Sequence, residues 1–425
     1  MIVFDPLYGR FEVPAYLTPL VLTPEVRRLS QVRFLNTMTP SLATLGELRR
    51  YSHTLGVLFL CGQLGMTDYA ADEVKALAAS VLLHDIGTPP FGHLFEYHLK
   101  ESSGWTHEGI IRDILWGAHA PENRAHQIFA GRTIEFRTAL KSSGIALDLV
   151  ENIVSNKHPL SSLLFGTIDL DDLDNVARMG WALGLSGGGQ VATRLASTLE
   201  VDRSSVLRLP VTERETVCKW TRLRNEVYEI LVFDPPTVAA QAVLSEAIET
   251  GIKHGTLSED DWCLSDEQLL DRLRLDPTTK DIVAIEYLGQ LPEMVCAIQL
   301  KGNLPDFQLS DRAQAKELIE NVFGDVIGEA RVLGYVFVDS GTFEKCLSFR
   351  DPRTEACWTE GVSSTSVVLY AFVRSRKRPS AARTRSAADR LLERLGCSKE
   401  QLVRCKIAPF AESVDGQRSL DFSTQ

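Results

Sequence analysis

Residues 70–97 read AADEVKALAASVLLHDIGTPPFGHLFEY, and this stretch indicates both an architecture and a chemistry. Alanine and leucine dominate residues 70–83, which predicts a helix with an apolar face. The helix runs directly into His84 and Asp85, and the Gly-Thr-Pro-Pro sequence at 87–90 must end it. Because polar groups on an apolar helix are costly to bury, we expect a metal ion or a partner to compensate them.

Apolar side chains at helical spacing recur through most of the chain before residue 330, and strand-like runs follow. β-branched and aromatic residues at 332–338 and 366–373 predict two strands, and the Ser-Gly-Gly-Gly sequence at 186–189 predicts a loop. The ranges expected to be helical are 24–34, 44–66, 70–83, 147–154, 170–183, 213–232, 237–252, 265–273, 311–322 and 387–395.

The length and composition are typical of a soluble globular protein with two or three domain-sized units. The 425 residues are 44% hydrophobic and 24% charged. We expect a helical core at 1–200, a helical extension packed on it at 201–330, and a small α+β region with a basic segment and a flexible tail at 331–425. The expected fold class is therefore mainly α with a small β-containing C-terminal part.

Three features of the sequence predict a cytoplasmic protein without a membrane partner. No apolar stretch approaches the roughly 18 residues that a membrane span needs. The N-terminal sequence MIVFDPLYGRF lacks the basic-then-apolar pattern of a secretory signal. The eight cysteines are scattered and form no CxxC pair, which fits thiols in a reducing compartment better than a disulfide framework.

The formal net charge of −11 argues against a general nucleic-acid binder. An anionic substrate such as a nucleotide would need a metal ion and a few Arg, Lys or His residues to reverse the local field. The basic segment at 374–385 is interpreted as a solvated linker between the last strand and the last helix, because serine and alanine interleave its charges without aromatic stacking residues. A nucleic-acid or effector contact is the less favoured alternative.

Four residues considered together predict a divalent metal site, since such ions take neutral imidazoles and carboxylates as ligands. They are His53 in RRYSHTLGV, His84 and Asp85 in LLHDIG, and Asp171 in IDLDDLDN. An isolated His-Asp pair is frequent by chance, but here a histidine precedes it and an acidic helix follows it. Ordinary polar roles are expected for the histidines at positions outside these motifs: His98, His119, His126, His158 and His254.

The motifs resemble the HD-domain superfamily of metal-dependent phosphohydrolases, and specifically its deoxynucleoside triphosphate triphosphohydrolase branch. FDPLYGRF is similar to a DPIHG-type element, RRYSHTLGV to RFEHSLGV, and HDIGTPPFGHLFE to HDxGHxPFSHxFE. WTHEG resembles a downstream HE element, and IDLDDLDNVAR resembles the segment that supplies the last metal-binding aspartate. The resemblance covers about residues 1–200, which are therefore expected to form the HD-domain core.

The resemblance implies that His53, His84, Asp85 and Asp171 hold one divalent ion, which could be Mn, Fe, Mg, Zn or Co. Arg50 would reach the substrate phosphates with its planar guanidinium, as the arginine three residues before the first histidine does in the family.

The resemblance also implies four catalytic residues around the scissile phosphate: His93, Glu96, His107 and Glu108. A histidine titrates in the range that suits a general acid or base. His107, with Glu108 beside it, is the best candidate for transferring a proton to the leaving oxygen.

Several positions depart from the family pattern. Thr88 stands where many triphosphohydrolases have a further active-site histidine, and Asn36 is the nearest match to a sugar-reading glutamine. Asp172, Asn175 and Met179 replace a lysine, a tyrosine and a second aspartate, so a phosphate-facing positive charge is lost. The metal ligands are unaffected, whereas the surrounding pocket differs.

Asp172 has a second interpretation, in which it faces solvent with Asp169 and Asp174 on an acidic helix surface.

The leading functional hypothesis is a nucleotide phosphohydrolase that releases tripolyphosphate from a deoxynucleoside triphosphate. The alternatives are a hydrolase of mono- or diphosphates or of an unusual nucleotide, and a catalytically weak nucleotide-binding regulatory protein. The resemblance further implies a homo-oligomer.

Overall fold

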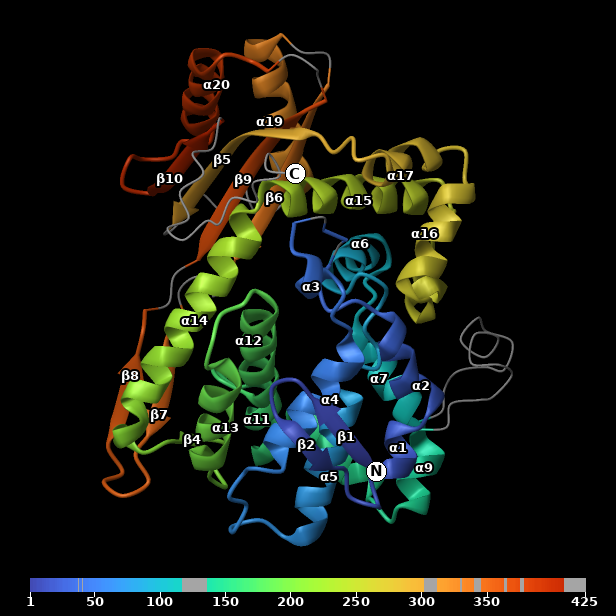
Figure 1. Cartoon of the computed structure of the whole chain (residues 1–425), viewed down its shortest axis with the longest axis vertical. Coiled ribbons are helices and arrows are strands. Elements are labelled where there is room, and N and C mark those ends of the chain that lie inside the picture. The colour runs from blue at the N-terminus through green and yellow to red at the C-terminus, as the bar shows by residue number, and fades with distance from the viewer. Residues whose placement is uncertain are drawn as a thin grey trace, which may run out of the picture. The chain divides into compact units, whose positions relative to one another are not determined.

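The computed structural model describes residues 1–36, 38–39, 41–116, 136–301, 312–328, 331–339, 345–362, 365–374 and 378–408 (Figure 1). The chain divides into two compact units. Unit 1 comprises Met1–Leu291 and Gly341–Ser364, and unit 2 comprises Pro292–Ser340 and Thr365–Gln425. Helices predominate, which confirms the expected mainly α fold.

Unit 1 is built from helices around one apolar core. Its α-helices are α1 (Thr18–Val21), α2 (Pro24–Arg28), α3 (Ala43–Gly46), α4 (Arg50–Cys61), α5 (Ala71–Leu83), α6 (His93–Ser103), α7 (His107–Trp116), α9 (Phe136–Ser142), α10 (Leu147–Val154), α11 (Ser162–Phe165), α12 (Leu170–Ala182), α13 (Gly188–Thr198), α14 (Arg214–Phe233), α15 (Pro235–Lys253), α16 (Asp266–Leu275) and α17 (Lys280–Tyr287). Short 3-10 turns (Leu29–Gln31, Pro159–Ser161, Val211–Glu213 and Glu259–Cys263) join several of them.

Helices α4, α5 and α12 matter most for function, and α4 packs against both of the others. Helix α5 begins where the Glu73 carboxylate accepts a hydrogen bond from the Ala70 N–H. Helix α12 begins where the Asp169 carboxylate accepts one from the Asp172 N–H. These caps fix the first turns of the two helices, and α5 ends at Leu83, directly before His84.

Unit 1 also contains two small sheets. Strands β1 (Ile2–Asp5) and β2 (Gly9–Glu12) form an antiparallel hairpin at the N-terminus. The second sheet has the order β3-β4-β7-β8 and is made of short strands from distant parts of the sequence. Their bounds are β3 (Glu200–Val201), β4 (Leu207–Arg208), β7 (Leu347–Arg350) and β8 (Cys357–Glu360).

Unit 2 is an α+β unit with a core of its own. Its antiparallel sheet has the order β10-β5-β9-β6, and α19 and α20 pack against each other and against strands of the sheet. The bounds are β5 (Glu293–Lys301), α19 (Arg312–Ile327), β6 (Val332–Asp339), β9 (Ser366–Val373), α20 (Ala381–Arg394) and β10 (Leu402–Ile407).

The structure differs from the sequence prediction at several places. The expected loop at 186–189 is shorter, because α13 already begins at Gly188. A strand, β5, lies inside the range 201–330 that was expected to be helical. Its residues are mostly apolar without helical spacing, and those from Met294 to Leu300 are all buried, as in a central strand.

The basic segment at 374–385 connects β9 to α20 only up to Ser380, because α20 begins at Ala381 and contains Arg383 and Arg385. The strand before it is not the last one, since β10 follows α20. Residues 375–377 of this segment are outside the described residues. The three segments expected from the sequence remain a prediction, and the compact units follow different boundaries: residues 341–364, between β6 and β9, belong to unit 1. No described helix combines the length and apolarity of a membrane span.

Candidate metal centre

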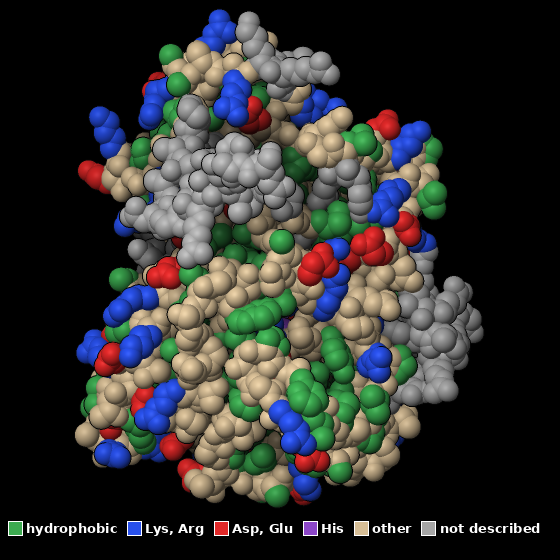
Figure 2. Space-filling model, in the orientation of Figure 1, with side chains coloured by type: hydrophobic (Ala, Val, Ile, Leu, Met, Phe, Trp, Pro, Cys, Tyr) green, Lys and Arg blue, Asp and Glu red, His purple; other side chains and the backbone are tan. Residues whose placement is uncertain are grey.

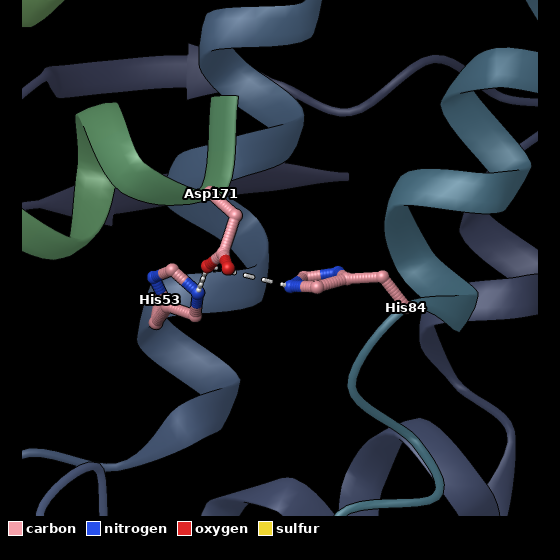
Figure 3. Close-up of side chains that lie close together, drawn as sticks. All are labelled: His53, His84 and Asp171. Carbon is pink, nitrogen blue, oxygen red and sulfur yellow. Dashed lines mark ion pairs between the residues drawn. The ribbon is translucent and has the colours of Figure 1, made fainter. Parts of the chain in front are cut away.

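Three of the predicted metal ligands meet in unit 1. His53 projects from α4, His84 follows α5, and Asp171 lies in the first turn of α12. Figure 3 shows both imidazoles pointing at the Asp171 carboxylate from different sides. The Nε2 atoms of His53 and His84 lie 2.7 Å and 3.8 Å from Asp171 Oδ1, and the three ligand atoms fall within 4.8 Å of one another.

The ring of His84 is held with one nitrogen free for a ligand. Its Nδ1 donates to the Val81 carbonyl at 2.6 Å, which leaves Nε2 as the acceptor in the neutral ring. Nε2 is buried and has no hydrogen-bond partner. A buried acceptor without a partner costs free energy, and a cation at this position would remove that cost. The three residues therefore fit a divalent ion.

Asp85, the fourth predicted ligand, lies beside this group but has partners of its own. Its Oδ2 is 4.0 Å from His53 Nε2 and 3.8 Å from His84 Nε2. Both carboxylate oxygens accept from Arg50 Nη1, at 2.9 and 3.1 Å, and Oδ1 also accepts from the Thr88 hydroxyl at 2.9 Å. Arg50 thus orients Asp85, and Thr88 takes part in the same hydrogen-bond network.

A second carboxylate behind the centre fixes the orientation of His53. The Nδ1 atom of His53 donates to Asp174 Oδ2 at 2.7 Å, and Asp174 is fully buried. Asp174 also accepts two hydrogen bonds from Arg178 and one from the Tyr8 hydroxyl. A carboxylate on the remote nitrogen of a metal-binding histidine sets its tautomer and raises its basicity. Burial lowers the pKa of His53, but the hydrogen bonds to Asp171 and Asp174 outweigh burial and raise it to about 9.

The N-terminal hairpin supports this arrangement. Asp5 forms an ion pair with Arg178 at 3.0 Å, and its other oxygen accepts from the Leu7 and Tyr8 amides. Gly56 leaves room for the network, because a Cβ there would lie 2.0 Å from Asp174 Oδ1. The role of Asp174 was not predicted from the sequence, because its spacing of three residues from Asp171 and four from Arg178 indicates a shared helix face but not which aspartate is buried.

The four predicted catalytic residues form a second group. His107 Nδ1 donates to Glu96 Oε1 at 2.5 Å, and His93 Nδ1 donates to Glu96 Oε2 at 2.9 Å. The Glu108 carboxylate lies 3.7 Å from His107 Nε2. Burial lowers the pKa of His107, but Glu96 outweighs burial and raises it. Burial raises the pKa of Glu96, but its two histidine partners outweigh burial and lower it.

The loop after Asp85 brings this second group close to the metal centre. A Cβ at Gly87 would lie 2.8 Å from the His107 carbonyl oxygen, so only glycine permits the close approach of the two backbones. Phe91 has a φ of 54°, and its N–H donates to the Asp266 carboxylate at 2.9 Å. Gly92 allows Arg50 to approach, since a Cβ there would lie 2.7 Å from its Nη2.

Comparison with known proteins identifies the region that carries both groups. Residues 50–179 match the family model of the HD domain. The chain contains an HD domain. The matched range begins at α4 and ends within α12, so it includes His53, His84 and Asp171.

Curated relatives of the HD-domain region are distant. The protein YwfO of Bacillus subtilis is 26% identical over 256 residues, which are 57% of this chain and 54% of that protein. The Dictyostelium discoideum homolog of deoxynucleoside triphosphate triphosphohydrolase SAMHD1 is 26% identical over 201 residues, or 44% and 37% of the two chains. Human deoxynucleoside triphosphate triphosphohydrolase SAMHD1 is 27% identical over 119 residues, or 25% and 19%. The chain thus spans about half or less of the length of these relatives.

A solved structure supports the fold beyond the HD domain. The crystal structure of a phosphohydrolase from Bacteroides thetaiotaomicron aligns with a TM-score of 0.62 and covers 88% of this chain and 100% of that chain. The sequence identity is 16%, so the likeness concerns the fold.

The acidic helix surface considered for this part of the HD domain is not present. Asp169 and Asp174 are buried, and Asp172 pairs with Lys345, which precedes β7. Burial raises the pKa of Asp169, and the neighbouring carboxylates of Asp172 and Asp171 raise it further. Asn175, one turn after Asp171, has a buried side-chain oxygen without a hydrogen-bond partner.

Two of the histidines outside the motifs have ordinary hydrogen-bond partners, and His254 is exposed. His98 bonds to Ser245 at 2.8 Å, and His158 bonds to Glu73 at 3.1 Å. His119 and His126 lie outside the described residues.

Proposed function

We propose that the chain is a metal-dependent phosphohydrolase of nucleotides, and that its leading reaction converts a deoxynucleoside triphosphate to a deoxynucleoside and tripolyphosphate. The observation that carries the proposal is the buried His84 Nε2, which has no hydrogen-bond partner and faces His53 and Asp171 inside an HD domain. Two distant relatives, deoxynucleoside triphosphate triphosphohydrolase SAMHD1 from human and its Dictyostelium discoideum homolog, support this choice of substrate.

His53, His84 and Asp171 would hold the ion, and Asp85 is a fourth candidate ligand. When bound, a divalent ion supplies Lewis-acid polarisation of a phosphoryl oxygen and activates water near neutral pH. Arg50 contributes by holding the Asp85 carboxylate through Nη1, while its Nε has no hydrogen-bond partner. We expect Arg50 to turn part of its guanidinium toward a substrate phosphate.

His107 is proposed to protonate the leaving oxygen. Its Nδ1 is occupied by Glu96, so Nε2 is the atom that can deliver a proton. Glu96 stabilises the protonated ring because it adds negative charge at hydrogen-bond distance. Proton transfer of this kind contributes on the order of 10² to 10⁴ in rate. His93 is 69% exposed at its side chain, and we propose that it helps to position Glu96.

A single nucleotide suits the surface charge better than a nucleic-acid polymer. The net charge is −11. On the face drawn in Figure 2, Lys and Arg alternate with Asp and Glu over the residues shown in colour, without a continuous basic area. A polymer would need such an area to neutralise successive phosphates.

Product analysis against a nucleotide panel tests the proposal. Ribo- and deoxynucleoside mono-, di- and triphosphates are each incubated with Mn²⁺, Mg²⁺, Fe²⁺ or Co²⁺, beside a His84→Ala, Asp85→Ala control. Deoxynucleoside plus tripolyphosphate from the wild type, and neither from the control, is the expected result. Absence of turnover from every compound with metal still bound would contradict it and favour a nucleotide-binding regulatory protein.

A second candidate function is hydrolysis of mono- or diphosphates or of an unusual nucleotide. Asp172 and Asn175 favour it, because they make this side of the centre more acidic and less aromatic than the family pattern. Orthophosphate released from monophosphates in the same panel would support this function over the leading one.

A further inference from the structure

The three proposed ligands of the metal centre differ in how far their side chains are exposed to solvent. The Asp171 side chain is 40% exposed, whereas those of His53 and His84 are 1% and 8% exposed. Among these three ligands, Asp171 is therefore the one that a substrate arriving from solvent reaches first. The groups next to Asp171 on α12 will meet that substrate first.

Lys345 contacts the residue next to Asp171. Its ammonium pairs with Asp172, the residue that follows Asp171, and its side chain is 24% exposed. Two other cations near the centre also pair with carboxylates but are more deeply buried: Arg178, 1% exposed, pairs with Asp174 and Asp5, and Arg50, 9% exposed, pairs with Asp85. Lys345 is thus the partly exposed cation among these three.

The hairpin that carries Lys345 is firmly anchored in unit 1. Leu347, two residues later, is fully buried in the core of this unit. Strand β7 pairs with β4 in parallel, with Arg350 in register with Arg208. The indole N–H of Trp358 in β8 donates to the Leu209 carbonyl at 3.0 Å. A Cβ at Gly361 would lie 2.3 Å from the Lys345 carbonyl oxygen, so glycine lets the backbone directly after β8 pass close to Lys345.

We propose that Lys345 binds the phosphate chain of the substrate, exchanging its contact with Asp172 for a phosphate oxygen. This inference rests on the proposed function. A polyphosphate arriving past Asp171 meets the carboxylates of Asp171 and Asp172, and a cation must offset that repulsion. A lysine suits this role because its flexible ammonium can move between two acceptors. Asp172 would then hold Lys345 in place until substrate arrives.

The alternative is that Lys345 only tethers its hairpin to α12. The two roles predict different effects of two single substitutions on the affinity for an anion. If Lys345 is a tether, Lys345→Met and Asp172→Asn remove the same contact and weaken anion binding equally or not at all. If Lys345 binds phosphate, Lys345→Met weakens binding, while Asp172→Asn removes a repelling charge and leaves binding unchanged or tighter.

The test is calorimetric titration of the full chain, supplied with Mg²⁺, with inorganic tripolyphosphate. We expect Lys345→Met to weaken binding roughly ten- to a hundredfold, as for loss of a charge-assisted hydrogen bond. Lys345→Arg should retain most of the affinity, which guards against a folding defect in the methionine variant. Lys219→Met and Glu215→Gln, from an exposed pair on α14, are matched controls that should bind as the wild type does.

Three results would overturn the inference: wild-type affinity in Lys345→Met, equal weakening in Lys345→Met and Asp172→Asn, or no tripolyphosphate binding by the wild type. Turnover in the nucleotide panel separates the two proposals. Nucleotide turnover by the wild type, together with wild-type affinity for tripolyphosphate in Lys345→Met, would contradict the role of Lys345 but not the proposed reaction. Tripolyphosphate binding that depends on Lys345, without turnover of any nucleotide, would contradict the proposed reaction but not the role of Lys345.

Discussion

At the residue scale, the centre depends on histidines whose two nitrogens have separate tasks. His53 and His84 each use Nδ1 for a protein acceptor, Asp174 and the Val81 carbonyl respectively, and turn Nε2 toward Asp171. The convergence of His53, His84 and Asp171 could be predicted from the motifs. Asp174 could not be separated from its acidic neighbours, because only the packing of α12 against α4 decides which aspartate is buried.

Removing the carboxylate behind His53 should weaken metal binding. Asp174→Asn is expected to lower Mn²⁺ affinity about 10- to 100-fold, because it no longer fixes the tautomer of His53. Tyr8→Phe removes one neutral hydrogen bond to the same carboxylate and should cost much less. Equilibrium dialysis measures both, with circular dichroism to confirm folding. Unchanged affinity in a folded Asp174→Asn variant would contradict this role.

The pair of Glu96 and His107 should set the alkaline limit of activity. His107 acts as an acid only while protonated, so kcat/KM falls as pH rises through its pKa, which Glu96 holds above the ordinary value. Glu96→Gln leaves burial to lower that pKa, and the alkaline limb should move to lower pH. Glu108→Gln, whose carboxylate is exposed and 3.7 Å away, should move it less. An unmoved limb in Glu96→Gln would assign the proton transfer to another group.

At the element scale, the sequence predicted α5, α10 and α12 almost to the residue, because apolar spacing and capping residues are local signals. Strand β5 was missed because a fully buried strand has no alternating pattern to separate it from a buried helix. The hairpin of β7 and β8 was also missed. Its Lys345 contacts a residue 173 positions earlier, and no local pattern reports such a contact.

The crossing of α4 and α12 should tolerate no side chain at Gly56. Gly56→Ala would place a methyl group 2.0 Å from Asp174 Oδ1, in a network that is buried and cannot move aside. We expect a loss of about 1–3 kcal/mol in the free energy of unfolding and weaker Mn²⁺ binding. Gly324→Ala in α19, where a Cβ meets nothing within 4 Å, should be neutral or slightly stabilising. Chemical denaturation compares the two, and equal stabilities would contradict the argument.

At the scale of the whole molecule, each compact unit has its own core, and the proposed metal ligands His53, His84 and Asp171 belong to unit 1. Because a ligand stabilises only the state that binds it, Mn²⁺ should slow hydrogen exchange in α4, α5 and α12. The strands of unit 2, β5 and β9, should show little change. Mass spectrometry of exchanged peptides measures this. Equal protection of both units would show that the ion acts on the chain as a whole. The expected homo-oligomer and cytoplasmic location remain predictions.

The central claim is that His53, His84 and Asp171 hold the ion on which hydrolysis depends. Its most direct test is to count Mn²⁺ bound by the metal-stripped full chain in equilibrium dialysis, for the wild type, His84→Ala and the exposed control His254→Ala. We predict one tightly bound ion per chain in the wild type and in His254→Ala, and its loss in His84→Ala. Wild-type stoichiometry and affinity in His84→Ala would contradict the claim.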